Sequence, residues 1–254
     1  MTKIMDRVEN KSNEELRLEW NRIAAWRHEQ LINGCDISYL YVLLPATLKM
    51  QKDCNLRAVL DVGCGTGFFI NKIADRCERL VGVDISDGSI EVAKSYCISK
   101  NNVNFINSSI EEYARTIAQP YFTTCFANMT LMDCIHLEEV LKSIFHILKP
   151  GGVIICSITH PCFWPAYWGY SLADWFDYWS ETPVEAAFVT SNAKSKYVTT
   201  HIHRPLSAYF TAFKSTGFKL DLIDEPMPSV ETKHKYKEQW KYPRFIVFRF
   251  VKPD

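Results

Sequence analysis

The chain has 254 residues, of which 47% are hydrophobic, so it can bury a substantial core, and we expect one decorated domain. Lysine and arginine total 29, as do aspartate and glutamate, so no net field attracts nucleic acid or an anionic membrane. This balance excludes nucleic-acid binding driven by overall charge and favours a small or neutral partner.

The nine cysteines are scattered, with no Cys-x-x-Cys pair and no spacing typical of zinc ligands. The start of the chain is polar and charged rather than signal-like, and no apolar run approaches the roughly 20 residues that span a bilayer. We therefore expect a protein of the reducing cytoplasm, with no metal and no membrane partner.

Two helices are expected before the core. Ser12 and Glu15 have the spacing of a capping box, and apolar residues then recur at helical spacing to about Trp26. A second helix is expected over 38–50. Residues 1–56 stand outside a minimal nucleotide-binding fold, so this helical extension either covers a ligand or packs against the core.

Between residues 57 and 160 strands and helices alternate, which predicts a parallel sheet. A ligand should lie beyond the carboxyl ends of the strands, where the chain reverses direction across the sheet. Strands are expected near 58–62, 80–84, 103–106, 121–127 and 152–158, with helices near 67–76, 87–99 and 137–148.

The turn after the first strand contains Gly63, Gly65 and Gly67, between an apolar strand and an apolar helical face. Glycine permits positive φ and lets a ligand approach the backbone and the helix N-terminus. A dinucleotide fingerprint would need its third glycine at Phe68, so the spacing disfavours a pyrophosphate ligand. Asp84 ends the second strand, where a carboxylate can bind a ribose diol.

The segment Asp61–Gly67 resembles the first motif of the class I S-adenosylmethionine-dependent methyltransferases, in their small-molecule, type 11-like group. Asp84 is similar to the acidic ribose-binding position, and residues 148–152 to the turn before the fifth strand. The resemblance covers about residues 58–160. It implies a Rossmann-like α/β fold with a seven-stranded, mostly parallel sheet and an antiparallel last strand. It also implies S-adenosyl-L-methionine as the cofactor and S-adenosyl-L-homocysteine as the product.

The resemblance implies that the glycine turn lies near the methionyl part of the donor, with Asp84 on the ribose and Ile85 and Ile110 flanking adenine. Family members commonly have an acidic residue before the Ile110 position, where this chain has Ser109, whose hydroxyl or backbone could replace it. Asn128 either contacts the amino-acid part of the donor or caps the next turn. The expected cofactor-binding residues are Asp61, Gly63, Cys64, Gly65, Gly67, Asp84, Ile85, Ser109, Ile110, Asn128 and Met129.

An insertion after the fifth strand is expected over 161–204, because regular alternation stops after His160. Its aromatic run, 163–179, either packs as a hydrophobic lid or encloses an apolar or aromatic acceptor and faces the sulfonium cation. The acceptor-binding candidates are Trp164, Tyr167 and Trp168.

Residues 205–254 are expected to complete the core. A helix near 206–215 is followed by strands near 218–223 and 244–251, which would add the antiparallel edge.

His160 is the first candidate for a base or acceptor-orienting residue, because imidazole titrates near pH ~6.5. Its alternative role is to fix the insertion by hydrogen-bonding the backbone. His201 and His203 alternate as in a strand, and His203, nearer the end of its segment, is the second candidate base. No nearby Asp, Glu or Cys completes a metal site around them. Cys162 is expected to be structural rather than nucleophilic.

Methyl transfer to an oxygen or nitrogen atom of a small molecule is the function we expect. Methylation of a peptide or protein, and a non-catalytic S-adenosylmethionine-binding sensor or partner subunit, are the alternatives. Residues 128–131 read Asn-Met-Thr-Leu and lack the Asp/Asn-Pro-Pro-aromatic motif of many amino methyltransferases. Exocyclic base amines are therefore not expected as acceptors.

Overall fold

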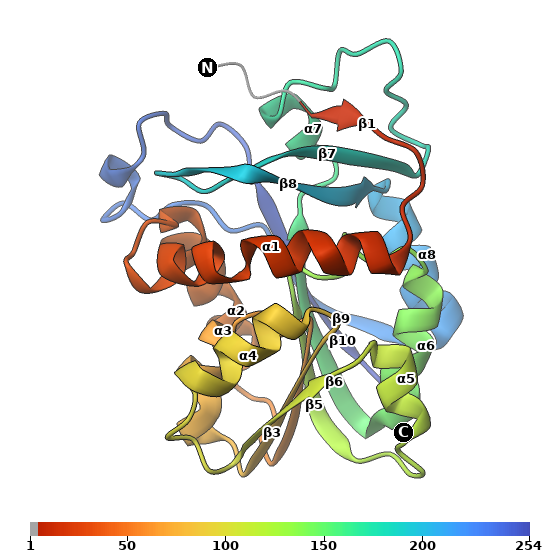
Figure 1. The fold of residues 1–254 in the computed structure, drawn as a ribbon. Coiled ribbons are helices and arrows are strands. Elements are labelled where there is room, and N and C mark those ends of the chain that lie inside the picture. The colour runs from red at the N-terminus through yellow and green to blue at the C-terminus, as the bar shows by residue number, and fades with distance from the viewer. Residues whose placement is uncertain (1–4) are drawn as a thin grey trace.

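The computed structural model describes residues 5–254, and its centre is a seven-stranded sheet in the order β4-β3-β2-β5-β6-β10-β9 (Figure 1). Strands β2 to β6 pair in parallel, while β10 runs antiparallel between β6 and β9. The expected mostly parallel sheet with an antiparallel last strand is confirmed. Its strands are β2 (Ala58–Val62), β3 (Arg79–Asp84), β4 (Val103–Asn107), β5 (Phe122–Asn128), β6 (Leu148–Thr159), β9 (Lys219–Asp224) and β10 (Phe245–Val251).

Helices cover both faces of this sheet because its central strands are apolar on both sides. Val59 packs with the helices of one face and Leu60 with those of the other, as alternation along a strand requires. One face carries a π-helical turn (Tyr39–Leu43), α2 (Leu44–Met50), α3 (Phe68–Ile73) with a 3-10 turn (Ala74–Arg76), and α4 (Asp87–Tyr96). The other carries α5 (Ile110–Arg115), which the sequence does not predict, α6 (Leu137–Ile147) and α8 (Leu206–Thr216).

The first helix, α1 (Asn13–Ile32), is longer than its expected end at Trp26. Its N-terminus has the expected capping box: the Glu15 N–H donates to Ser12 Oγ at 3.2 Å, and the Ser12 N–H donates to the Glu15 carboxylate at 2.8 Å. The helix continues because Leu31 packs in the core beside α2 and α3. Within residues 5–254, no helix has the length and apolar character needed to cross a bilayer.

A second sheet, which the sequence does not predict, combines two strands of the insertion with a short strand near the start of the described residues. Strands β1 (Asp6–Arg7), β7 (Thr182–Val189) and β8 (Lys194–His203) pair antiparallel, and the remaining short elements are α7 (Trp164–Tyr167) and a 3-10 turn (Lys233–Lys235). Helix α1 packs on both α4 and β8, and so lies between the small sheet and the core (Figure 1).

Candidate functional site

A cavity of about 230 Å³ lies at the carboxyl ends of β2, β3 and β5, where the strand order reverses on the two sides of β2. Helix α1 forms its cover through Leu16, Trp20 and Ala24. All the predicted cofactor residues except Gly67 line this cavity: Asp61, Gly63, Cys64, Gly65, Asp84, Ile85, Ser109, Ile110, Asn128 and Met129.

The three glycines of the turn all have positive φ but differ in what surrounds them. A Cβ on Gly63 would lie 2.4 Å from Thr130 Oγ1, whereas a Cβ on Gly65 would meet nothing within 4 Å. Gly67 begins α3, and a Cβ there would lie 3.1 Å from the Cβ of Ala93 on α4. Gly67 thus permits close packing of two helices, and its contact with a cofactor stays a prediction.

Two carboxylates, the buried Asp61 and the half-buried Asp84, lie beside the turn. Asp84 accepts hydrogen bonds from the Gly65 and Ser86 backbone N–H groups, both at 2.8 Å, so its position is held by the turn itself. Burial nevertheless raises the pKa of Asp84, and burial together with the charge of Asp84 raises the pKa of Asp61 well above its usual range.

Two polar atoms in the lining of this cavity are buried without a hydrogen-bond partner in the described chain. They are Oδ1 of Asp61 and Nδ2 of Asn128. The Oδ1 atom of Asn128 accepts a hydrogen bond from the Thr47 hydroxyl of α2 at 3.3 Å, which orients the amide. Because buried polar groups are ordinarily paired, this acceptor and this donor are available to a ligand, and their contact with a cofactor stays a prediction.

A second cavity, of about 170 Å³, contains the acceptor-binding candidates Trp164, Tyr167 and Trp168 in its lining. The residues that line both cavities, here called the junction residues, are Trp20, Arg27, Tyr39, Met129 and Asp133. The two cavities therefore meet at a shared wall, with the predicted cofactor residues in one and the aromatic insertion in the other.

The rest of the aromatic run has a packing role. Tyr170 is 1% exposed and packs with Trp168, while its ring stacks on Trp175 at 5.7 Å between centroids. Trp179, by contrast, is 73% exposed. Some rings of the run thus line the second cavity and others form a small core beneath the second sheet, so packing is observed, while contact of any ring with an acceptor stays a prediction.

The two candidate catalytic histidines lie outside the lining of both cavities. Both ring nitrogens of His160 are engaged: Nε2 lies 2.7 Å from Glu225 Oε1, and Nδ1 accepts from the Cys162 N–H at 3.2 Å. His203 Nε2 donates to the Tyr178 carbonyl at 3.1 Å. The structure places both rings as anchors of the insertion, which was the alternative for His160, and a catalytic role for either stays a prediction.

Several ionisable residues that are not predicted from the sequence line the second cavity, and Asp133 and His201 are two of them. Asp133 is a junction residue, and burial, followed by the charge of Glu19, raises its pKa well above the usual range. His201 is held neutral, because burial and then the charges of His203 and Arg204 lower its pKa to about 3.

A sequence signal existed for both residues. Asp133 follows the strand whose end already provides Asn128, and His201 shares the alternating segment from which His203 is chosen. Within residues 5–254, no group of three or more His, Cys, Asp or Glu side chains gathers as a metal ion would require.

Residues 59–152 match a family model described as a methyltransferase domain. The chain is similar to a demethylmenaquinone methyltransferase from Lactococcus lactis subsp. lactis, with 30% identity over 125 residues, or 45% of this chain and 47% of the relative. It is also similar to a ubiquinone biosynthesis O-methyltransferase from Saccharophagus degradans, with 32% identity over 106 residues, or 40% of this chain and 43% of the relative. The similarity spans about half the length of these relatives.

Two solved structures share the fold over most of their length. One is an S-adenosylmethionine-dependent methyltransferase from Listeria monocytogenes, described as putative, with a TM-score of 0.66 and 22% identity, covering 82% of this chain and 96% of that one. The other is the N-methyltransferase NodS from Bradyrhizobium japonicum in complex with S-adenosyl-L-homocysteine, with a TM-score of 0.60 and 13% identity, covering 95% and 98%. At these identities the likeness establishes the fold.

Proposed function

On the premise that the chain belongs to the class I S-adenosylmethionine-dependent methyltransferases, we propose that it transfers a methyl group to an oxygen or nitrogen atom of a small molecule. The observation that carries this proposal is the shared wall of the two cavities. A donor in the first cavity and an acceptor in the second would meet at the junction residues.

The lining of the first cavity fits S-adenosylmethionine. The amino-acid part of this donor carries an ammonium and a carboxylate, which complement the unpaired Asp61 Oδ1 and Asn128 Nδ2. Each oxygen of Asp84 accepts one backbone hydrogen bond and retains lone pairs for ribose hydroxyls. The open space above Gly65 lets a ligand approach the backbone of the turn.

The bound donor supplies a methyl group on a sulfonium centre, so the protein has to align the acceptor, exclude water and receive a proton. Trp20 of α1 and Met129 form apolar parts of the junction and restrict water there. Asp133 is the junction carboxylate with the raised pKa, and we assign it the acceptor's proton. A raised pKa brings a carboxylate closer to the range that a general base needs near neutral pH.

The alternatives differ in what the second cavity would admit. A cavity of about 170 Å³ beneath an aromatic insertion suits a compact molecule better than a folded protein surface, which favours the small-molecule acceptor over a protein. A non-catalytic sensor would need no acceptor cavity beside the donor. We also propose a cytoplasmic location, which the nine free cysteines support.

An assay with methyl-labelled S-adenosylmethionine tests this proposal. The labelled donor and the full chain are incubated with the small-molecule fraction of the producing cell and, in parallel, with its protein fraction. We expect label in a product of the small-molecule fraction. Label confined to the protein fraction would favour the peptide or protein alternative. Bound donor without transfer to either fraction would favour the sensor.

A further inference from the structure

Arg244 lines the second cavity and immediately precedes β10. Its guanidinium lies 3.8 Å from the ring centroid of Tyr167 and 4.2 Å from that of Trp240, so aromatic rings hold it in place. Its Nη1 donates to the Tyr167 hydroxyl at 2.7 Å. That is the one hydrogen bond that the guanidinium makes within residues 5–254, although an arginine carries five N–H donors.

The other arginines in comparably buried positions have carboxylate partners. Arg27, in the same cavity, pairs with Asp36 at 2.8 Å. Arg204 pairs with Glu181 at 2.8 Å and also donates to backbone carbonyls, and Arg249, on β10, pairs with Asp221. Arg244 forms no ion pair within the described residues.

The charge of Arg244 is poorly compensated by its surroundings. Burial lowers its pKa, and the carboxylate that acts on it, Glu238, is exposed and beyond ion-pair distance. A partly buried cation without a counterion is costly, and a ligand anion would remove that cost. Two parallel N–H donors of a guanidinium also match the geometry of a carboxylate.

We propose that Arg244 binds a carboxylate of the methyl acceptor. Identifying the ligand as the methyl acceptor rests on the proposed function, whereas the anion site rests on the contacts of Arg244 itself. Arg244 lines the second cavity but not the first, whereas Asp133 lines both cavities. The carboxylate and the methylated atom are therefore separate groups, and the product keeps its negative charge rather than becoming a methyl ester.

Benzoate and its neutral isostere benzamide serve as probes, titrated by calorimetry into the full chain saturated with S-adenosyl-L-homocysteine. The wild type should bind benzoate at least tenfold more tightly than benzamide. Arg244→Leu should lose this preference, and Arg244→Lys should restore part of it. Arg249→Leu, which removes a carboxylate-paired arginine of β10, should keep this preference.

Equal binding of the two probes by the wild type, or an unchanged preference in Arg244→Leu, would overturn the anion site. The affinity for S-adenosyl-L-homocysteine and the thermal midpoint are measured for each variant, so that loss of folding is separated from loss of the anion site. The titration requires no turnover. A chain that prefers benzoate but transfers no label in the extract assay would keep the anion site and lose the proposed function.

Discussion

At the scale of single residues, Asp61 is expected to connect stability with ligand binding. Its folded-state pKa is raised, so the folded protein binds its proton more tightly than the unfolded chain does. The ionised carboxylate therefore costs stability, and this cost grows as pH rises from the unfolded pKa towards the raised folded pKa. Ligand-free stability at neutral pH is lowered by a group that the donor's ammonium would compensate.

Asp61→Asn should accordingly raise the thermal midpoint of the ligand-free protein by about 2 °C or more, which corresponds to roughly 1 kcal/mol in a chain of this size. The same change should weaken S-adenosyl-L-homocysteine binding at least tenfold, or by about 1.4 kcal/mol. Thermal unfolding and calorimetry measure the two effects. The exposed Asp53→Asn serves as the matched control. A variant that is less stable and binds normally contradicts this role.

Asp133 gives a pH dependence with a defined sign. Proton transfer to it requires the ionised carboxylate, and its pKa is raised, so kcat/KM should rise with pH through that raised pKa and then level. Asp133→Asn should lower kcat by about 100-fold and remove this limb. Glu111→Gln, which alters the lining of the first cavity alone, should keep the limb. Full activity of Asp133→Asn would exclude it as the base.

Site residues could be predicted from the sequence where their neighbours in the site are also near in the chain. Gly65 and Asp84 belong to one strand–turn–helix–strand unit, so spacing along the chain brings them together. Asp133 and Arg244 reach the second cavity only through the packing of α1, the insertion and β10. His160 lies at the expected strand end, yet its ring is directed to Glu225, which the sequence places 65 residues away.

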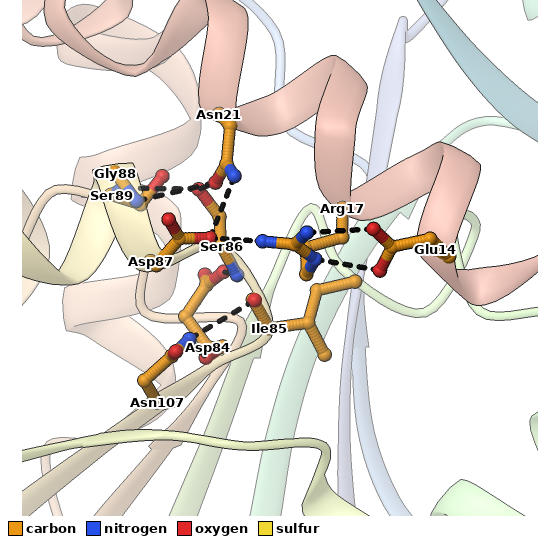
Figure 2. A network of polar contacts seen from close by, with 10 residues as sticks. All are labelled: Glu14, Arg17, Asn21, Asp84, Ile85, Ser86, Asp87, Gly88, Ser89 and Asn107. Carbon is orange, nitrogen blue, oxygen red and sulfur yellow. Dashed lines mark hydrogen bonds and ion pairs between the residues drawn. The ribbon is translucent and has the colours of Figure 1, made fainter.

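At the scale of elements, hydrogen bonds and an ion pair connect α1 to the turn after β3. The Asn21 amide donates to Asp87 Oδ1 at 2.7 Å and accepts from the Ser86 hydroxyl at 2.6 Å and the Gly88 N–H at 3.2 Å. Arg17 adds an ion pair with Asp87, and Figure 2 shows both α1 side chains reaching this turn. The cover of the first cavity is thus tied to the segment that carries the predicted ribose and adenine contacts.

Asn21→Ala should loosen this attachment, because it removes three hydrogen bonds and leaves the buried Ser86 hydroxyl without its acceptor, at a cost of about 1–3 kcal/mol. We expect faster hydrogen exchange in α1 and several-fold faster release of S-adenosyl-L-homocysteine, measured by mass spectrometry and stopped flow. Glu29→Ala, exposed on the same helix, should change neither. Unchanged exchange and release in Asn21→Ala would show that the network does not hold the cover.

The elements differ in how well the sequence predicts them. Alternating strands and helices are visible because each carries its own local pattern, a short and mostly apolar run in β2 and apolar residues at helical spacing in α6. The hairpin β7–β8 is less visible because its strands are mixed in burial and its partner β1 has only two residues. Its packing on α1 is a long-range contact that no local pattern records.

At the scale of the whole molecule, α1 lies between two sheets and contributes to both cavities (Figure 1). The core sheet positions the predicted donor residues, and the small sheet with the aromatic run forms part of the second cavity's lining. Because Trp20, Arg27 and Met129 line both cavities, the proposed donor and acceptor sites share one boundary. The fold class could be predicted from the sequence, whereas this arrangement depends on how the two sheets meet through α1.

Calorimetric titration of the full chain with S-adenosyl-L-methionine tests the donor site most directly. We expect one bound molecule per chain, with the affinity of Asp84→Ala reduced at least tenfold, or by about 1.4 kcal/mol. Absence of binding to the wild type, or equal affinity in Asp84→Ala, would contradict the assignment of the first cavity as the donor site.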